Sequence, residues 1–191
     1  MRKFLDTVGK ALQIGVKNDK GEVIGQGAIV TFSEDPGVSI TLKESAENPG
    51  MFFSVVNDDK KLPGPLSGGR TKTHFGLRMA NSDVAIKTAG FREDDPDVEK
   101  LLVVITDGEQ TKGGRGYESV GEAMKPFFDR DMDVFAIGVG LRKQKAKDEI
   151  NQMVEDKKNA IFPESYTDLI NNVNNFVRSF CPGKVPVETR E

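Results

Sequence analysis

The stretch that decides the fold is residues 100–110, Lys-Leu-Leu-Val-Val-Ile-Thr-Asp-Gly-Glu-Gln. Five consecutive aliphatic residues are typical of a strand that is buried on both faces, as the strands of a parallel sheet are. Asp107 and Gly108 follow where this strand ends, and open α/β sheets bind ligands at the carboxyl ends of their strands. Asp107 is therefore a candidate ligand of a hard cation. A strand-end turn, with Asp-Gly chosen for its backbone, is the alternative, and this stretch alone favours neither.

The rest of the chain continues the alternation of helix and strand. Apolar spacing predicts helices over residues 3–16, 46–59, 74–88, 117–129, 147–154 and 166–180. Further strands are predicted over residues 24–33, 38–42, 134–139 and 160–162. The turn signal at residues 35–37, Asp-Pro-Gly, joins the first two strands into an antiparallel edge hairpin. The pattern predicts a three-layer, Rossmann-like α/β fold, with a mostly parallel sheet and helices on both faces.

The length, charge and composition of the chain narrow the classes of protein to which it can belong. The chain has 191 residues, which suits one domain, expected here over residues 1–182 with a tail or linker at 183–191. A net charge of −3 with interspersed acids and bases argues against a nucleic-acid partner. No apolar run is long enough to span a membrane, and the N-terminus lacks the apolar core of a secretory signal. The lone cysteine, Cys181, excludes an internal disulfide.

A second informative loop lies upstream, at residues 67–73, Ser-Gly-Gly-Arg-Thr-Lys-Thr. Together with residues 105–109, Ile-Thr-Asp-Gly-Glu, it resembles the von Willebrand factor A domain, also called the integrin inserted domain. Residues 27–33, 133–140 and 165–169 resemble the family's second strand, fifth strand and last helix start, in the right order. The resemblance covers nearly the whole chain and implies a protein-binding module and not an enzyme.

The resemblance also implies a metal site. Family members hold Mg²⁺ or Mn²⁺ in a metal-ion-dependent adhesion site built by an Asp-x-Ser-x-Ser loop, a threonine and an aspartate. The threonine matches Thr71 and the aspartate matches Asp107. Hydroxyl and carboxylate oxygens suit such a hard ion, and a partner's carboxylate can replace one bound water. The residues expected to shape the ligand rim are Gly69, Arg70, Gly108 and Glu109. Thr73 is predicted to be a helix N-cap and His74 a surface residue.

The sequence departs from the family in one large way, because it has no Asp-x-Ser-x-Ser and no apolar strand before its first helix. The family's central first strand is expected before Arg2, so we infer a fragment of a longer extracellular protein. Mg²⁺, Mn²⁺ or Ca²⁺ is then expected only if the missing N-terminal loop is supplied. In extracellular members a cysteine after the last helix pairs with one before the first strand, so the resemblance implies that Cys181 bonds a cysteine outside this sequence.

Three functions remain open. The first is an adhesion or extracellular-matrix module that binds a matrix protein, for example collagen, through a metal-bridged acidic side chain. The second is a structural or interaction module without a metal. The third is a P-loop nucleotide hydrolase, because residues 64–71 are one substitution away from Gly-x-x-x-x-Gly-Lys-Thr. Arg70 replaces the required lysine, however, and Pro63 and Pro65 remove backbone donors from that loop.

Overall fold

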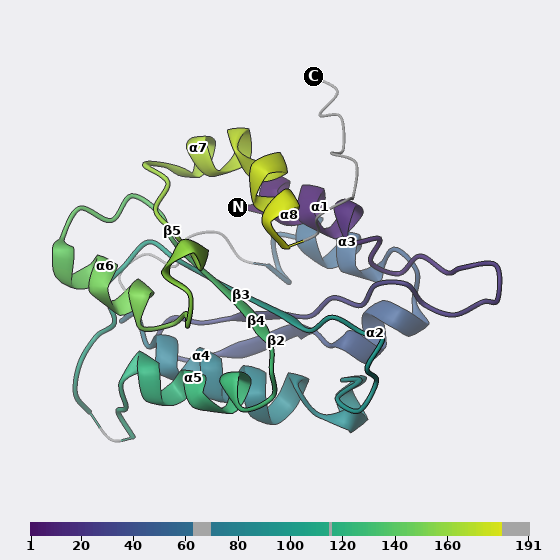
Figure 1. The fold of residues 1–191 in the computed structure, drawn as a ribbon, viewed down its shortest axis with the longest axis horizontal. Helices are drawn as coiled ribbons and strands as arrows, with labels where there is room; N and C mark the ends of the chain where they lie inside the picture. Colours follow the sequence, from purple (N-terminus) through teal and green to yellow (C-terminus); the bar gives the residue numbers. More distant parts are fainter. Residues whose placement is uncertain (63–69, 115, 181–191) are drawn as a thin grey trace.

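The computed structural model describes residues 1–62, 70–114 and 116–180, and their strands form two separate sheets (Figure 1). Strands β3 (Leu101–Thr106), β4 (Asp133–Gly138) and β5 (Ala160–Ile161) are parallel, in the order β3-β4-β5. Strands β1 (Ile29–Thr31) and β2 (Gly37–Ile40) pair antiparallel. The predicted α/β fold with a parallel sheet and an antiparallel hairpin is confirmed. Within the described residues the hairpin forms a sheet of its own beside the parallel sheet.

Short helices connect and cover these strands. They are α1 (Arg2–Ala11), α2 (Leu42–Glu47), α3 (Met51–Asn57), α4 (Thr73–Met79), α5 (Val120–Phe128), α6 (Gln144–Asn151), α7 (Tyr166–Asn171) and α8 (Val173–Phe180). A π-helical turn at Ala80–Val84 and 3₁₀ turns at Lys87–Ala89 and Lys157–Asn159 complete the list. The helices α1, α3, α7 and α8 lie on one side of the strands, and α4 and α5 lie on the other (Figure 1).

Three apolar clusters hold these layers together. One packs α4, α5 and α6 against the parallel sheet, with Val104, Met124 and Ile150 among its buried members. The second packs α1, α7 and α8 against the opposite face of that sheet, through residues such as Phe4 and Ile137. The third joins the hairpin to α3 and to the segment that follows α1. The described helices include none long and apolar enough to cross a bilayer.

Helix α1 is shorter than the spacing predicts, because the backbone leaves the helical region soon after Ala11. Gln13 has a φ of 53° and Gly15 a φ of 76°, and both values are left-handed. The chain then runs out and back in a hairpin-like excursion, where the amide of Ile24 donates to the carbonyl oxygen of Val16 at 2.8 Å. The predicted helix over residues 3–16 and the predicted strand over 24–33 were therefore too long.

Two other predicted helices are divided in two, and a third ends early. The 46–59 prediction corresponds to α2 and α3, which are separated at Gly50, the left-handed N-cap of α3 with a φ of 84°. The helix predicted over 74–88 is α4 plus the π-helical turn, and it stops before Ala85, whose ψ is 49°. The helix predicted over 166–180 breaks at Asn172 into α7 and α8. Two capping boxes, Thr41 with Glu44 and Ser119 with Glu122, fix the starts of α2 and α5.

Some predictions fall on residues outside the described part of the chain. They are the loop that contains Gly69, the P-loop-like stretch before Arg70, the environment of Cys181 and the tail at 183–191.

Candidate functional site

The first side of the site is the segment that leads into α4, from Arg70 to Thr73. The amide of Lys72 donates to the carbonyl oxygen of Ser33 at 2.9 Å, just beyond the end of β1. On the other side, the amide of Thr111 donates to the carbonyl oxygen of Thr71 at 2.8 Å, and the Thr71 amide donates to the Thr111 hydroxyl at 3.2 Å. These three bonds fix Thr71 between the carboxyl ends of β1 and β3.

The second side of the site is the loop that follows β3. A Cβ added to Gly108 would lie 3.1 Å from Oγ1 of Thr71, so the backbone after Asp107 approaches that hydroxyl closely. A glycine here leaves room for the contact. The structure therefore brings together the two loops that carry Thr71 and Asp107, as expected for residues at the carboxyl edge of one sheet.

Asp107 is exposed, and its carboxylate has one neighbour that the sequence did not predict. The phenol of Tyr166, at the start of α7, donates to Oδ2 of Asp107 at 3.4 Å. Burial, followed by the charge of Asp107 and this hydrogen bond, raises the pKa of the Tyr166 phenol to about 12. Tyr166 is therefore protonated at neutral pH and acts as a donor to the candidate ligand.

The rim beside Asp107 is charged. The ammonium of Lys145 lies 2.5 Å from Oε1 of Glu109, and this hydrogen bond is the main reason that the pKa of the Glu109 carboxyl is lowered. Lys143 and Lys112 lower that pKa further through their charge. Arg70 is exposed on the opposite side of the site. Since these groups are solvated, we assign them a role in the charge of the rim and not in stability.

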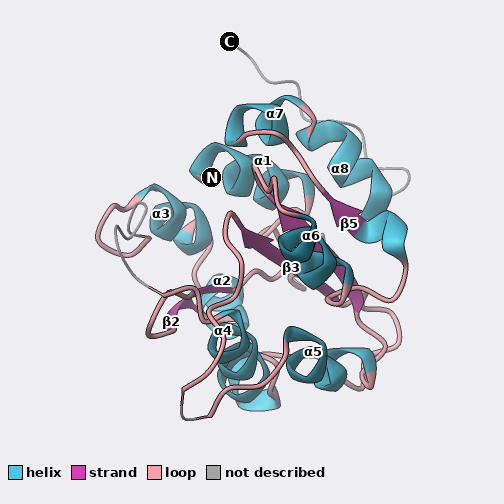
Figure 2. Ribbon diagram, turned by 90° about the vertical axis from the view of Figure 1, so that its left-hand side faces the viewer, coloured by secondary structure: helices cyan, strands magenta, loops and turns pink. Residues whose placement is uncertain are grey.

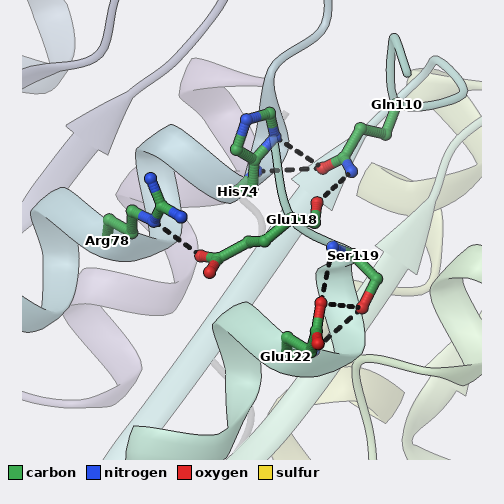
Figure 3. A network of polar contacts seen from close by, with 6 residues as sticks. All are labelled: His74, Arg78, Gln110, Glu118, Ser119 and Glu122. Carbon is green, nitrogen blue, oxygen red and sulfur yellow. Dashed lines mark hydrogen bonds and ion pairs between the residues drawn. The ribbon is translucent and has the colours of Figure 1, made fainter. Parts of the chain in front are cut away.

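The buried side-chain amide of Gln110 supports the loop that follows β3 (Figure 3). Oε1 of Gln110 accepts hydrogen bonds from the backbone amide of His74 at 3.0 Å and from Nδ1 of its ring at 3.1 Å. Nε2 of Gln110 donates to the carbonyl oxygen of Glu118 at 3.0 Å, which fixes the orientation of the amide. The Glu118 carboxylate in turn accepts from Nε of Arg78 at 2.7 Å. Gln110 thus links the loop after β3 to α4 and to the segment that precedes α5.

Gln110 also connects this loop to α6. Its backbone amide donates to Oε2 of Glu149 at 2.8 Å, and Glu149 is only 8% exposed. Burying a carboxylate is costly unless it is hydrogen-bonded or paired, and Lys112 lies 3.9 Å from its other oxygen. Through Gln110, both α4 and α6 hold the loop that carries Asp107.

Two predictions about this region were wrong. His74 is 2% exposed and not a surface residue, because its ring packs between Phe75 and Tyr117, with ring centroids 4.3 Å and 5.5 Å away. Thr73 is not the N-cap of α4, since that position belongs to Lys72. Its hydroxyl is buried and has no hydrogen-bond partner among the described residues.

The chemistry of the site fits part of a magnesium-binding site. Thr71 and Asp107 supply one hydroxyl and one carboxylate oxygen donor, which are the types that Mg²⁺ prefers. The described residues contain no group of three or more histidine, cysteine, aspartate or glutamate side chains able to hold a metal. An octahedral ion needs about six ligands, so the described side chains would have to be joined by further ligands and water.

Sequence reasoning named Thr71 and Asp107 but missed the residues that position their loops, namely Tyr166, His74, Gln110 and Glu149. None of these four residues stands in a motif with a chemical signature, and each becomes relevant through a partner far away in the sequence. The only signal in the sequence was weak: Gln110 is a polar residue close behind a buried strand.

Comparison with known proteins identifies the fold family. The family model of the von Willebrand factor type A domain matches residues 1–175. Mouse matrilin-1 is 29% identical over 117 residues, and mouse integrin alpha-M is 32% identical over 139 residues; each match covers 61% of this chain. The chain spans only 22% and 11% of the length of these two proteins.

A solved structure shares the same architecture. Proximal thread matrix protein 1 from the mussel byssus, in a structure with a zinc-occupied MIDAS motif, superposes with a TM-score of 0.70 at 20% identity. The match covers 94% of this chain and 42% of that protein. At this identity the likeness shows the fold alone. With the family model matching most of its length, the chain belongs to the von Willebrand factor type A domain family.

Proposed function

We propose that this chain is a non-enzymatic, protein-binding module of an extracellular adhesion or matrix protein. It engages an acidic side chain of a matrix partner at the edge that carries Thr71 and Asp107. The observation that carries the proposal is the close approach of the loops of these two residues, with Thr71 Oγ1 3.1 Å from the Cβ position of Gly108. The family membership and the adhesion and matrix relatives support the same function.

In this proposal Mg²⁺ or Mn²⁺ bridges the module and the acidic group of its partner. Thr71 and Asp107 would hold the ion, and the remaining protein ligands would come from outside the described residues. A bound divalent ion supplies positive charge and open coordination positions to an incoming carboxylate. Tyr166 holds the Asp107 carboxylate through its phenol, and Gln110 holds the loop backbone, so both would orient the ligand that faces the ion.

Arg70, Gly108 and Glu109 form the described part of the proposed rim, and Gly69 would extend it. Exposed Lys143 and Lys112 lie near Glu109 and add positive charge, which suits an acidic partner. A disulfide from Cys181 to a cysteine outside this sequence, and a preceding strand with an Asp-x-Ser-x-Ser loop, remain predictions of the family resemblance.

The second candidate is a structural or interaction module without a metal. The observation in its favour is the small number of metal ligands among the described residues. Membership of the von Willebrand factor type A family gives no support to the third possibility, a P-loop nucleotide hydrolase.

The test is binding to an immobilised panel of matrix proteins, collagen included, in Mg²⁺ and in EDTA, by a protein that carries this chain together with the N-terminal Asp-x-Ser-x-Ser loop that the metal requires. We expect binding that EDTA weakens and that Asp107→Asn weakens by at least about tenfold, because the amide removes a charged ligand. Asp129→Asn is the matched control, since it makes the same exchange at an exposed carboxylate at the end of α5, outside the proposed rim. Binding that neither EDTA nor Asp107→Asn changes would establish the metal-independent module instead.

A further inference from the structure

Exposed cations gather on three segments at the carboxyl edge of the parallel sheet. One segment leads into α4, the second follows β3, and the third follows β4 and begins α6. Figure 2 views the molecule from the end at which α6 lies. The exposed cations of these segments are Arg70, Lys112, Arg142, Lys143 and Lys145, and we call this set the basic arc. The chain as a whole has a net charge of −3, so the arc departs from the charge of the rest of the molecule.

Backbone contacts join the first two segments of the basic arc. The amide of Thr111 donates to the carbonyl oxygen of Thr71 at 2.8 Å, and the amide of Thr71 donates to the hydroxyl of Thr111 at 3.2 Å. Arg70 precedes one of these bonded residues and Lys112 follows the other. The guanidinium of Arg70 and the ammonium of Lys112 are therefore carried by neighbouring stretches of backbone.

Glu109 joins the second segment to the third. The ammonium of Lys145 lies 2.5 Å from Oε1 of Glu109. Lys143 and Lys112 also lie close enough to lower the pKa of the Glu109 carboxyl through their charge. The cations of the loop after β3 and those at the start of α6 therefore belong to one surface.

The carboxylates of this surface do not neutralise the basic arc. Glu109 pairs with Lys145, and the buried Glu149 lies 3.9 Å from Lys112. The cations that form no ion pair with another described residue are Arg70, Arg142 and Lys143. Positive charge therefore stays free for an anionic ligand.

The start of α6 is poorly suited to the helix itself. Helices favour Ser, Thr, Asp or Asn at the N-cap and anionic side chains in the first turn. The N-cap of α6 is Lys143, with no side-chain cap and no acidic residue in the first turn. By contrast, α2 and α5 begin with capping boxes. A local rule of stability that is broken in this way is expected where binding selects the residues.

The basic arc consists of charged side chains without an exposed apolar centre. The large hydrophobic side chains exposed among the described residues are Val16 and Ile24, and both lie in the excursion that follows α1. Interfaces between folded proteins usually bury an apolar and aromatic centre inside a polar rim. Lysine holds its charge on a flexible stem without a fixed direction. The arc therefore suits a flexible polyanion better than the surface of a folded acidic protein.

We propose that the basic arc binds a sulfated polysaccharide of the extracellular matrix. Sulfate groups repeated along a flexible chain can meet cations that come from three separate segments, and the release of counterions favours such binding. The choice of a sulfated polysaccharide over a nucleic acid rests on the extracellular setting of the proposed function. The binding itself uses neither Thr71, Asp107 nor a metal, and it adds a second class of ligand to that function.

The experiment measures the binding of a heparin hexasaccharide in EDTA by the same protein as in the metal-binding test. We expect saturable binding that weakens at least tenfold as NaCl rises from about 75 to about 300 mM, because polyanion binding releases counterions. We expect an N-acetylated hexasaccharide without sulfate groups to bind at least tenfold more weakly, since it keeps only its carboxylates. EDTA removes the metal, so this result and the metal-dependent function can fail separately.

A charge reversal at the start of α6 tests the site. We expect Lys143→Asp to weaken hexasaccharide binding at least tenfold. The matched control is Lys157→Asp, which makes the same exchange at an exposed lysine in the turn before β5, at the opposite end of the parallel sheet. The urea midpoint of Lys143→Asp should equal or exceed that of wild type, because aspartate is a preferred N-cap. Weaker binding without lower stability would exclude misfolding as the cause.

Three outcomes would overturn the proposal. The first is the absence of saturable binding to the hexasaccharide at about 75 mM NaCl. The second is equal affinity of Lys143→Asp and Lys157→Asp for the hexasaccharide. The third is binding of polyglutamate or duplex DNA as tight as that of the hexasaccharide, which would make an acidic polypeptide or a nucleic acid an equally good ligand.

Discussion

Gly90 shows how one residue can fix the path of the chain. Its φ is +94°, and a Cβ at this position would lie 2.6 Å from the backbone nitrogen of Lys43 and 2.8 Å from its Cα. We expect Gly90→Ala to lower the free energy of unfolding by about 2–5 kcal/mol, from left-handed strain of roughly 1–2 and overpacking of roughly 1–3 kcal/mol. The measurement is urea denaturation. Gly50→Ala is the control, since Gly50 has a φ of +84° and open space around it; equal losses would contradict the role of the Lys43 contact.

Tyr166 gives the candidate site a measurable pH dependence. The pKa of its phenol is raised from 10.0 to about 12, first by burial and then by Asp107. Because the folded pKa lies above the unfolded value, the stabilisation is complete below pH 10 and is lost as the pH rises through about 12. We expect wild type to lose more stability than Tyr166→Phe over this range, in unfolding experiments at each pH.

Asp107→Asn separates the effect of burial on the Tyr166 pKa from the effect of the Asp107 charge. The variant removes the charge beside the phenol but leaves its burial, so we expect the Tyr166 pKa to move only part of the way back toward 10.0. Ultraviolet titration in a Tyr117→Phe background reads Tyr166 alone, because the chain has two tyrosines. A full return to the ordinary value would show that burial contributes little.

At the scale of the element, strand β3 carries an asymmetry that hydrogen exchange can detect in the free protein. In a parallel ladder, alternate residues of a strand bond to the same neighbour. The amides of Leu102, Val104 and Thr106 face β4, and those of Leu101 and Val103 point to the other edge of β3, with which no described strand pairs. We expect the amides of Leu101 and Val103 to exchange faster, because an amide without a strand partner is protected less. The control is the stretch of β4 that pairs with both β3 and β5, where this alternation should be absent. Uniform protection along β3 would mean that its second edge is paired.

At the scale of the whole molecule, helix α1 holds the two sheets together. Phe4 is 1% exposed, and its ring lies 5.2 Å from that of Phe176 in α8. We expect Phe4→Ala to cost about 3–5 kcal/mol, which is a large part of the roughly 5–15 kcal/mol that stabilises a domain. Since α1 and the turn behind it reach two apolar clusters, circular dichroism should show one cooperative transition.

The matched substitution for that experiment is Val16→Ala. Val16 is 45% exposed, so its truncation should change the free energy of unfolding by less than about 0.5 kcal/mol. If Phe4→Ala lowers the free energy of unfolding as little as Val16→Ala does, or if the two sheets unfold in separate transitions, α1 does not couple the two sheets.

The sequence by itself determined the class of fold and the family. Long apolar runs such as residues 101–105 and 134–139 identify strands because the signal is local, and Asp35-Pro36-Gly37 identifies the hairpin turn for the same reason. The resemblance also selected Thr71 and Asp107, whose loops the structure brings together, although their role as metal ligands remains a prediction.

Only the tertiary structure decided where the elements end and what surrounds the site. Helix α1 stops early because Gln13 adopts a left-handed conformation, and no local pattern signals that choice. His74 is buried, and Gln110 and Tyr166 support the site, through contacts with segments distant in the sequence. Among the described residues β3 has one strand neighbour, and its composition does not reveal this, because an apolar strand has the same sequence pattern whether one or two neighbours pair with it. Burial and pairing depend on which segments meet in space, and that information lies in the packing of the whole chain.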